Sequence, residues 1–135
     1  MKIVFFQGTF DLLNVGHIRA FKVARSKGDR LVVGLNSDSL IRWFKLREPI
    51  LPFVQRREIL ESIKGIDQIV ECHEPQAIRY LKRYKANVYV LTDEWERQQK
   101  EAIAYMKESG GVVYFSPRYP DIMDSSAIRE KIKQG

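Results

Sequence analysis

The stretch KIVFFQGTFDLLNVGH, residues 2–17, decides the fold of this chain. Its apolar first part, residues 2–7, predicts a buried β-strand that runs directly into Gly8. After the turn, apolar residues recur at helical spacing and predict a helix over residues 16–27. A strand, a glycine turn and the amino end of a helix form a site suited to anions, because free backbone N–H groups and the helix dipole favour negative charge there. His17 lies in the first turn of this helix, where a ring nitrogen can face a bound phosphate.

Apolar runs alternate with helical stretches along the rest of the chain. The predicted strands cover residues 2–7, 30–36, 66–70, 87–91 and 112–115. The predicted helices cover residues 16–27, 53–64, 74–84, 96–109 and 125–133. Residues 39–51 predict a short helix and a basic loop, and residues 117–124 a further loop. This alternation predicts a single α/β domain with a doubly wound, mainly parallel five-stranded sheet. We expect residues that follow strands 1, 2, 4 and 5 to converge on one crevice, because ligands of such sheets bind at the carboxyl ends of strands.

The composition favours a protein that binds anions. The chain has 135 residues, a net charge of +6 and an isoelectric point near 9.5. This balance suits nucleoside triphosphates, sugar phosphates or nucleic acid, although a solvated basic surface gives the same charge. Cys72 is the single cysteine and has no Cys/His partner at metal-ligand spacing, so we expect a structural thiol and no side-chain metal motif. No signal peptide or membrane-spanning stretch is recognisable, so we expect a cytoplasmic protein without a membrane partner.

Two motifs carry a resemblance to a known enzyme family. Gly8-Thr9-Phe10-Asp11 followed by Asn14-Val15-Gly16-His17 resembles the signature G-T-F-D-x-x-H-x-G-H of the HxGH nucleotidyltransferases, in their cytidylyltransferase branch. The segment 123–129, Met-Asp-Ser-Ser-Ala-Ile-Arg, is similar to the family's I-S-[ST]-T-x-I-R. The chain departs from these motifs by carrying Asn14 in place of a histidine and Asp124 in place of a serine. The resemblance covers nearly the whole chain and implies a Rossmann-like nucleotidyltransferase fold.

The resemblance implies four catalytic residues. Attack of a substrate phosphate on the α-phosphorus of a nucleotide gathers negative charge, which positioned donors and cations stabilise. His17, Lys45 and Arg129 would supply this stabilisation, with Asn14 as a neutral hydrogen-bond donor. Because Asn14 carries no charge, a non-catalytic nucleotide-binding protein stays open as an alternative.

The resemblance also implies a larger set of nucleotide-binding residues. These are Gly8, Thr9, Phe10, Asp11, Gly16, Arg56, Lys64, Asp93, Trp95, Arg118, Ser125 and Ser126. In this interpretation Gly8 lets the backbone approach the phosphates closely. Ordinary structural roles are open for two of them: Lys64 as a cation at a helix carboxyl end and Trp95 as a core aromatic residue.

The sequence therefore predicts a nucleotidyltransferase that uses a nucleoside triphosphate with Mg²⁺ and a phosphorylated small-molecule acceptor. Thr92-Asp93-Glu94-Trp95 resembles the G-D-D-W segment of glycerol-3-phosphate cytidylyltransferases, which favours CTP and glycerol 3-phosphate. Asn36-Ser37-Asp38 instead resembles the adenylyltransferase domain of heptose-nucleotide synthesis, which leaves ATP and a sugar phosphate as the alternative. No nucleic-acid-binding module is recognisable. Analogy with the family implies a homodimer.

Overall fold

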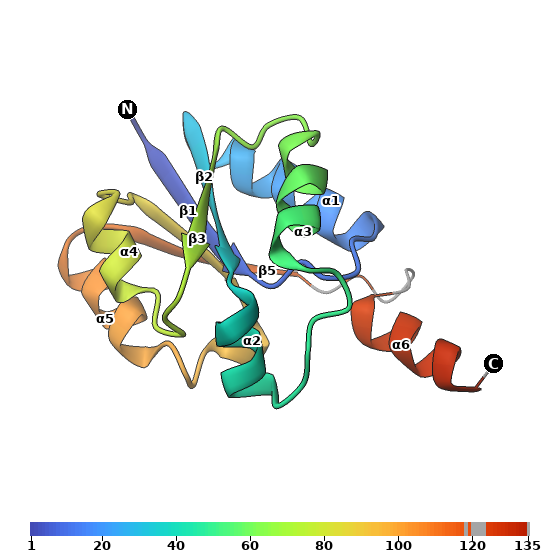
Figure 1. The fold of residues 1–135 in the computed structure, drawn as a ribbon. Helices are drawn as coiled ribbons and strands as arrows, with labels where there is room; N and C mark the ends of the chain where they lie inside the picture. Colours follow the sequence, from blue (N-terminus) through green and yellow to red (C-terminus); the bar gives the residue numbers. More distant parts are fainter. Residues whose placement is uncertain (118, 120–123, 135) are drawn as a thin grey trace.

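The computed structural model describes residues 1–117, 119 and 124–134 (Figure 1). Its elements in chain order are β1 (Ile3–Gly8), α1 (Val15–Ser26), β2 (Arg30–Asn36), α2 (Asp38–Lys45), α3 (Phe53–Glu61), β3 (Gln68–Cys72), α4 (Ile78–Arg83), β4 (Val88–Thr92), the 3₁₀ helix η1 (Asp93–Trp95), α5 (Lys100–Glu108), β5 (Val112–Ser116) and α6 (Ser125–Gln134). The predicted alternation of strands and helices is confirmed. In these ranges no helix is long and apolar enough to cross a bilayer.

The sheet is parallel throughout and has the strand order β3-β2-β1-β4-β5. The chain moves outward from β1 through β2 to β3, and then crosses back to place β4 on the other side of β1. This reversal confirms the predicted doubly wound architecture. It also locates the ligand crevice expected of such sheets, beyond the carboxyl ends of β1 and β4.

Helices cover both faces of the sheet (Figure 1). On one face, Phe21 of α1 and Leu60 of α3 are buried against β1 and β2. On the other face, Leu81 of α4 and Met106 of α5 are buried against the same sheet. Burial of each such side chain stabilises the fold by about 1.5–3 kcal/mol. The two cores hold the strands rigidly, so that residues just beyond the strands have fixed positions.

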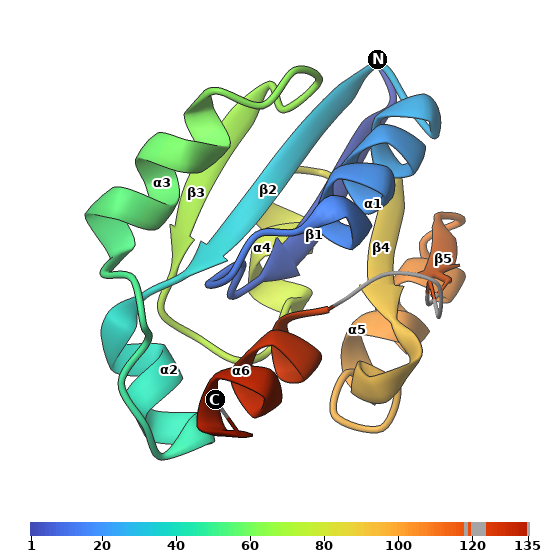
Figure 2. The ribbon, with the colours of Figure 1, turned by 90° about the vertical axis from the view of Figure 1, so that its right-hand side faces the viewer.

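Two helices lie beyond the carboxyl edge of the sheet instead of on a face. Figure 2 shows both helices, α2 and α6, at this edge. The side chain of Ser37 caps α2 by accepting the N–H of Leu40 at 3.1 Å. The carboxylate of Asp124 caps α6 by accepting the N–H of Ala127 at 2.8 Å. The two helices bring side chains from distant parts of the sequence to the expected ligand crevice.

One predicted helix begins later than its sequence pattern indicates, since α4 starts at Ile78 and not at residue 74. The cause is the buried side chain of Gln99 at the start of α5. It accepts the N–H of Ala77 at 3.0 Å and donates to the carbonyl of Pro75 at 2.7 Å. These bonds satisfy the backbone without a helix, which a local pattern cannot reveal.

Three further elements differ from the prediction by two residues or more, and one of them is α3, which ends at Glu61 and not at residue 64. α5 begins at Lys100 and not at residue 96, because the chain after β4 first winds into η1. β3 spans Gln68–Cys72 and not residues 66–70, because its ladder with β2 begins only after Asp67. The carboxylate of Asp67 instead accepts the N–H of Leu31 at 2.7 Å.

Cys72, at the end of β3, is fully buried. Burial raises the pKa of its thiol to about 12. The thiol is therefore protonated and inert at neutral pH, in agreement with the structural role expected from the sequence.

Candidate active site

The amino end of α1 is closed by the side chain of Asn14. Its Oδ1 accepts the backbone N–H of Gly16 at 2.9 Å and also that of His17, while its Nδ2 donates to the carbonyl of Leu12 at 3.1 Å. Two amides that the sequence suggests for anion binding are thus engaged within the helix cap. Asn14 is first of all the N-cap of α1, a role that the sequence reasoning did not assign to it.

His17 has a defined tautomer. Its Nδ1 accepts the backbone N–H of Asn14 at 3.2 Å, which completes a capping box. Desolvation by burial lowers the pKa of His17 to about 4, with the charge of Asp124 acting in the opposite direction. The imidazole is therefore neutral at pH 7 and carries its proton on Nε2. Such a ring can offer one hydrogen bond to a phosphate oxygen, as a donor without a charge.

Phe10 turns the chain at the end of β1. Its φ of 48° lies in the left-handed region, which strains a residue other than glycine. Its ring folds back over Gly8, so that a Cβ at Gly8 would lie 2.5 Å from the ring Cζ. The ring also packs against Phe6 and Phe21. A side chain at Gly8 would thus meet the ring of Phe10, a constraint that the sequence did not indicate, and the close approach of a phosphate to Gly8 stays a prediction.

Asp11 is buried, with its carboxylate turned into the protein. It accepts the N–H of Ile50 at 2.7 Å and that of Leu51 at 2.8 Å. The same carboxylate pairs with Arg129 at 3.3 Å and with Arg47 at 3.8 Å. With four donors around it, Asp11 anchors protein groups, a role that the resemblance did not imply.

Lys45, Arg47 and Arg129 form a cation cluster beside Asp11. Desolvation lowers the pKa of Lys45, and the charges of Arg47 and Arg129 lower it further, whereas Glu94 and Asp11 raise it. Three cations against two carboxylates leave a positive local charge, which suits a polyphosphate. The structure thus brings the predicted catalytic residues Lys45 and Arg129 together.

α6 contributes to both parts of the site. Arg129 reaches Asp11, and among the described residues no acceptor meets its buried Nε. The charge of Asp124, just before the helix, acts on His17. Ser125 begins the helix, and the side chain of Ser126 is exposed in its first turn. The predicted site residue Arg118 lies outside the described residues.

Arg56 is fully buried, and its guanidinium is engaged by the protein. It donates to the carbonyls of Leu51, Thr9 and Asn36, each at 2.9 Å. Its Nη2 pairs with the carboxylate of Asp38 at 2.6 Å. A side chain with 0% exposure cannot touch a nucleotide, so the predicted contact is wrong for this structure. Arg56 instead clamps the ends of β1 and β2 to the start of α2.

Lys64 lies at the opposite edge of the sheet. It follows α3 and precedes β3, in the connection that runs along the amino ends of the strands. Its neighbour Gly65 lies near Arg25 in the last turn of α1, and Arg25 pairs with Asp67 at 3.2 Å. Ligands of such sheets bind at the carboxyl edge, so Lys64 lies away from the expected crevice, and its nucleotide contact stays a prediction.

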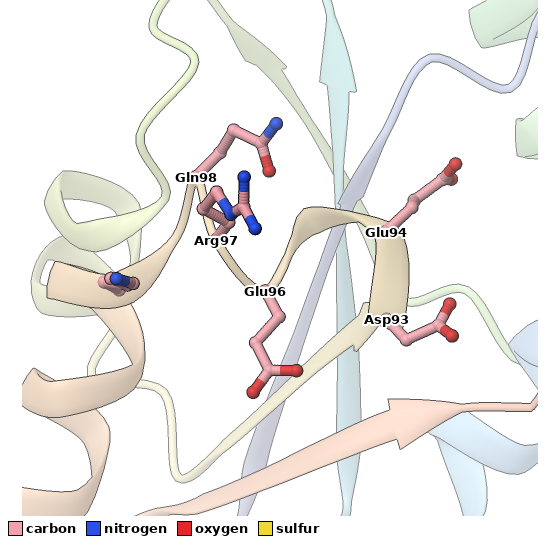
Figure 3. Close-up of a pocket in the computed structure, with 6 residues that line it drawn as sticks. Asp93, Glu94, Glu96, Arg97 and Gln98 are labelled. Atoms are coloured by element: carbon pink, nitrogen blue, oxygen red, sulfur yellow. The ribbon is translucent and has the colours of Figure 1, made fainter.

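A hollow of about 550 Å³ adjoins η1 (Figure 3). It is lined by Asp93, Glu94, Glu96, Arg97, Gln98 and Lys100. Asp93 is exposed directly after β4, so its carboxylate can face a ligand there. Trp95 instead packs against the core, and its ring meets Phe44 edge-on with centroids 5.8 Å apart. Trp95 therefore has the core role that the sequence left open. The hollow does not include His17 or the cation cluster, so it can form only an outer part of the site.

Comparison with known proteins places this geometry in a family. The model of the cytidylyltransferase-like family matches residues 5–131. The chain belongs to the cytidylyltransferase-like family. This membership agrees with the resemblance that the two sequence motifs carry.

Three relatives of this cytidylyltransferase-like chain illustrate the likeness. It is 33% identical to the bifunctional protein HldE of Geotalea uraniireducens over 99% of its own length and 27% of that protein. It is 33% identical to HldE of Pseudomonas aeruginosa over 98% of its length and 28% of that protein. The chain therefore spans just over a quarter of these curated relatives. The crystal structure of a lipopolysaccharide core biosynthesis protein from Thermoplasma volcanium matches with a TM-score of 0.74 and 25% identity, covering 88% of this chain and 99% of that one.

Mg²⁺ fits this cytidylyltransferase-like site only together with a nucleotide. Among the described residues no group of three or more His, Cys, Asp or Glu side chains could hold a metal. Mg²⁺ commonly binds through one or two carboxylates and the oxygens of substrate phosphates, where it neutralises their charge. Near the site, the carboxylates of Glu94 and Asp124 are exposed, and their charges act on Lys45 and His17 respectively.

The sequence analysis used Asn36-Ser37-Asp38 only to weigh ATP against CTP, and it did not include Asn36, Asp38 or Arg47 among the site residues. Asn36 is buried, accepts the side-chain N–H of Gln7 at 2.9 Å and donates to the hydroxyl of Thr9 at 3.2 Å. Thr9 thus keeps its hydroxyl hydrogen for another acceptor. The position of Asn36 and Asp38 in the sequence could have indicated a site role, because Asn36 ends a predicted strand and Asp38 follows that strand closely. The sequence shows Arg47 as a cation two residues after Lys45, but it does not indicate that Asp11 is its partner.

Proposed function

We propose that this chain transfers a nucleotidyl group from a nucleoside triphosphate to the phosphate of a small alcohol or sugar, and releases pyrophosphate. The observation that carries the proposal is the cation cluster of Lys45, Arg47 and Arg129 at the carboxyl edge of the sheet, beside α1 with its neutral His17. A surplus of positive charge and a preset hydrogen-bond donor together suit the charge that develops during phosphoryl chemistry.

The reaction needs little covalent help from the protein. An oxygen of the acceptor phosphate forms a bond to the α-phosphorus, and the bond from the α-phosphorus to the bridging oxygen of pyrophosphate breaks. In this proposal the Nε2–H of His17 donates to an α-phosphate oxygen. Lys45 and Arg129 neutralise the charge on the departing pyrophosphate. Asn14 orients His17 through its backbone N–H and serves as an additional neutral donor.

CTP with glycerol 3-phosphate is the first candidate substrate pair. The resemblance of Thr92-Asp93-Glu94-Trp95 to the glycerol-3-phosphate enzymes favours it, and Asp93 is exposed where a nucleotide can reach it. ATP with a sugar phosphate is the second candidate. It is supported by the structural relative whose title names lipopolysaccharide core biosynthesis, because that core is built from sugars.

The test is pyrophosphate release with Mg²⁺ across a panel of CTP, ATP, GTP and UTP, each combined with glycerol 3-phosphate and several sugar phosphates. Turnover with CTP supports the first candidate, and turnover only with ATP and a sugar phosphate supports the second. Saturable nucleotide binding without turnover in any combination would refute the proposed transfer and favour a non-catalytic nucleotide-binding protein. Sedimentation of the same preparation tests the homodimer that we propose by analogy.

A further inference from the structure

Asp11 stands between two segments that carry cations. One is the connection between α2 and α3, residues 46–52, and the other is α6. Its side chain is 1% exposed and contacts both segments, through Arg47 of the connection and Arg129 of α6. Arg47 and Arg129 are each partly exposed, at 33% and 21%, so both can also face a ligand.

The backbone contacts of Asp11 fix the connection itself. The two carboxylate oxygens accept consecutive N–H groups, those of Ile50 and Leu51. The carbonyl of Leu51 is in turn held by the buried Arg56. Charged partners therefore hold this peptide segment from both sides, and such bonds are stronger than those between neutral groups. The position of Arg47 follows from that of the segment that carries it.

The charges around Asp11 explain why a buried carboxylate is useful there. Arg47 and Arg129 each repel Lys45, since the charge of each arginine lowers the pKa of Lys45. A negative charge between the two arginines allows them to stay close. Since one carboxylate cannot neutralise three cations, the cluster still attracts an anion.

We propose that Asp11 is a positioning residue of the transfer reaction, which touches no substrate and holds Arg47 and Arg129 at the spacing at which both face one polyphosphate. The proposal rests on the proposed function for its catalytic meaning. Its geometric content, the preformed polyphosphate site, can be tested without turnover.

The first experiment measures binding of inorganic tripolyphosphate by calorimetry to the wild type and to Asp11→Asn. Asparagine keeps the shape of the side chain but loses the charge that gathers the arginines. We expect affinity to fall about tenfold or more, as for other broken buried charge pairs. Unchanged affinity would overturn the proposal.

Asp67→Asn is the matched control. Asp67 also accepts a backbone N–H at 2.7 Å and pairs with an arginine at 3.2 Å, but it does so at the amino edge of the sheet. We expect this variant to bind tripolyphosphate like the wild type. An equal loss in Asp67→Asn would mean that Asp11 acts through general stability alone, which contradicts the proposal.

Amide hydrogen exchange supplies a readout of position. In Asp11→Asn we expect faster exchange at Ile50 and Leu51 than in the wild type, because the charged acceptor of both amides is gone. Full protection of these amides would contradict the proposal. If the wild type binds tripolyphosphate but turns over no nucleotide, the proposed function fails while the positioning role of Asp11 is still tested.

The pH dependence of activity separates positioning from simple scaffolding. Lys45 faces Arg47, Arg129, Glu94 and Asp11, and the charge of Asp11 favours its protonated form. Asp11→Asn should therefore shift the alkaline limb of the kcat profile to lower pH and reduce kcat. An unchanged profile would contradict the proposal, because the carboxylate that is proposed to hold the cation cluster would then exert no charge on Lys45.

A second variant keeps the test decisive if Asp11→Asn does not fold. Arg47→Gln leaves the buried carboxylate and its backbone bonds in place and removes one of the gathered cations. We expect weaker tripolyphosphate binding in Arg47→Gln and wild-type binding in Arg42→Gln, since Arg42 is half-exposed and paired with Glu48 at 3.2 Å. Equal binding by both variants would overturn the proposal.

Discussion

His17 shows how the fold assigns different tasks to the two nitrogens of one imidazole. Nδ1 is occupied by the backbone of Asn14, and burial keeps the ring neutral. Both effects come from the start of α1, where residues 14–17 form the capping box. The donor that a phosphate would meet at Nε2 is therefore a product of how the helix begins.

The neutral state of His17 makes stability depend on pH. Its pKa is about 4 in the folded protein and 6.5 as the ordinary value, so between these limits the unfolded chain binds more protons. The free energy of unfolding should fall as the pH drops from about 6.5 to 4, by about 2–4 kcal/mol from this group. Urea titrations from pH 4 to 8 check this. His17→Gln should show a shallower decline over the same window, and an identical decline in both proteins would contradict the prediction.

Asn14 links stability and activity at a single position. Replacing it with histidine, the residue of the resembled motif, should raise kcat about tenfold by adding a donor that can also carry charge. The same change should lower the free energy of unfolding by about 1 kcal/mol, because the cap of Gly16 and His17 is lost. Steady-state kinetics and urea unfolding of Asn14→His measure both effects. A kcat that does not rise would mean that the site depends on the amide.

At the scale of elements, the site depends on short segments between rigid ones. Arg56 joins the carbonyls that follow β1 and end β2, and its pairing with Asp38 orients the start of α2. Asp38 also accepts the N–H of Phe53 at 3.0 Å, at the start of α3. One buried ion pair thus sets the relative positions of two strands and two helices.

Arg56→Lys tests this arrangement. Lysine keeps the charge but cannot reproduce the planar set of donors, so several buried carbonyls lose their partner. We expect the free energy of unfolding to fall by about 3 kcal/mol or more, as for other broken buried ion pairs. Arg57→Lys is the control, since Arg57 is exposed and pairs with the exposed Glu61 at 3.1 Å, and it should change stability by less than about 0.5 kcal/mol. Equal stability losses in the two variants would refute the clamp.

For the whole molecule, the parallel sheet separates two kinds of polar edge. The carboxyl edge gathers His17, Asp11 and the cation cluster, whereas the amino edge carries ion pairs such as that of Arg25 with Asp67. The net charge of the whole chain, +6, is therefore not the charge of the site, because cations at the amino edge also contribute to the net charge.

The distinction between the edges predicts different outcomes for two lysines. Lys45→Ala should lower kcat/KM about hundredfold, because it removes a cation from the site of developing charge. Lys64→Ala should leave kcat/KM within about twofold of the wild type, as expected for an exposed residue away from the crevice. Steady-state kinetics with saturating Mg²⁺ measure both. A loss in Lys64→Ala comparable with that in Lys45→Ala would contradict this division of the molecule.

The sequence predicts a strand or helix well where the element depends on the hydrophobic pattern of neighbouring residues. β1, β2 and the start of α1 appear almost as expected, because buried runs and helical spacing are properties of neighbouring residues. The late start of α4 was not predictable, since it depends on Gln99, which only the fold brings to Ala77.

Site residues that belong to local motifs were likewise easier to predict than those that depend on the fold. His17, Lys45 and Arg129 could be named from motifs, and the structure brings them to one edge. The burial of Arg56 could not be predicted, because it depends on the carbonyls of Thr9 and Asn36, which only the fold brings to this side chain.

The ring of Phe10 lying over Gly8 makes the mutational tolerance of one position conditional on the other. In a combinatorial library that randomises both codons, alanine at position 8 should survive selection only beside a small residue at position 10. A single-site scan would record both positions as intolerant and so overlook pairs of substitutions that evolution could have used together.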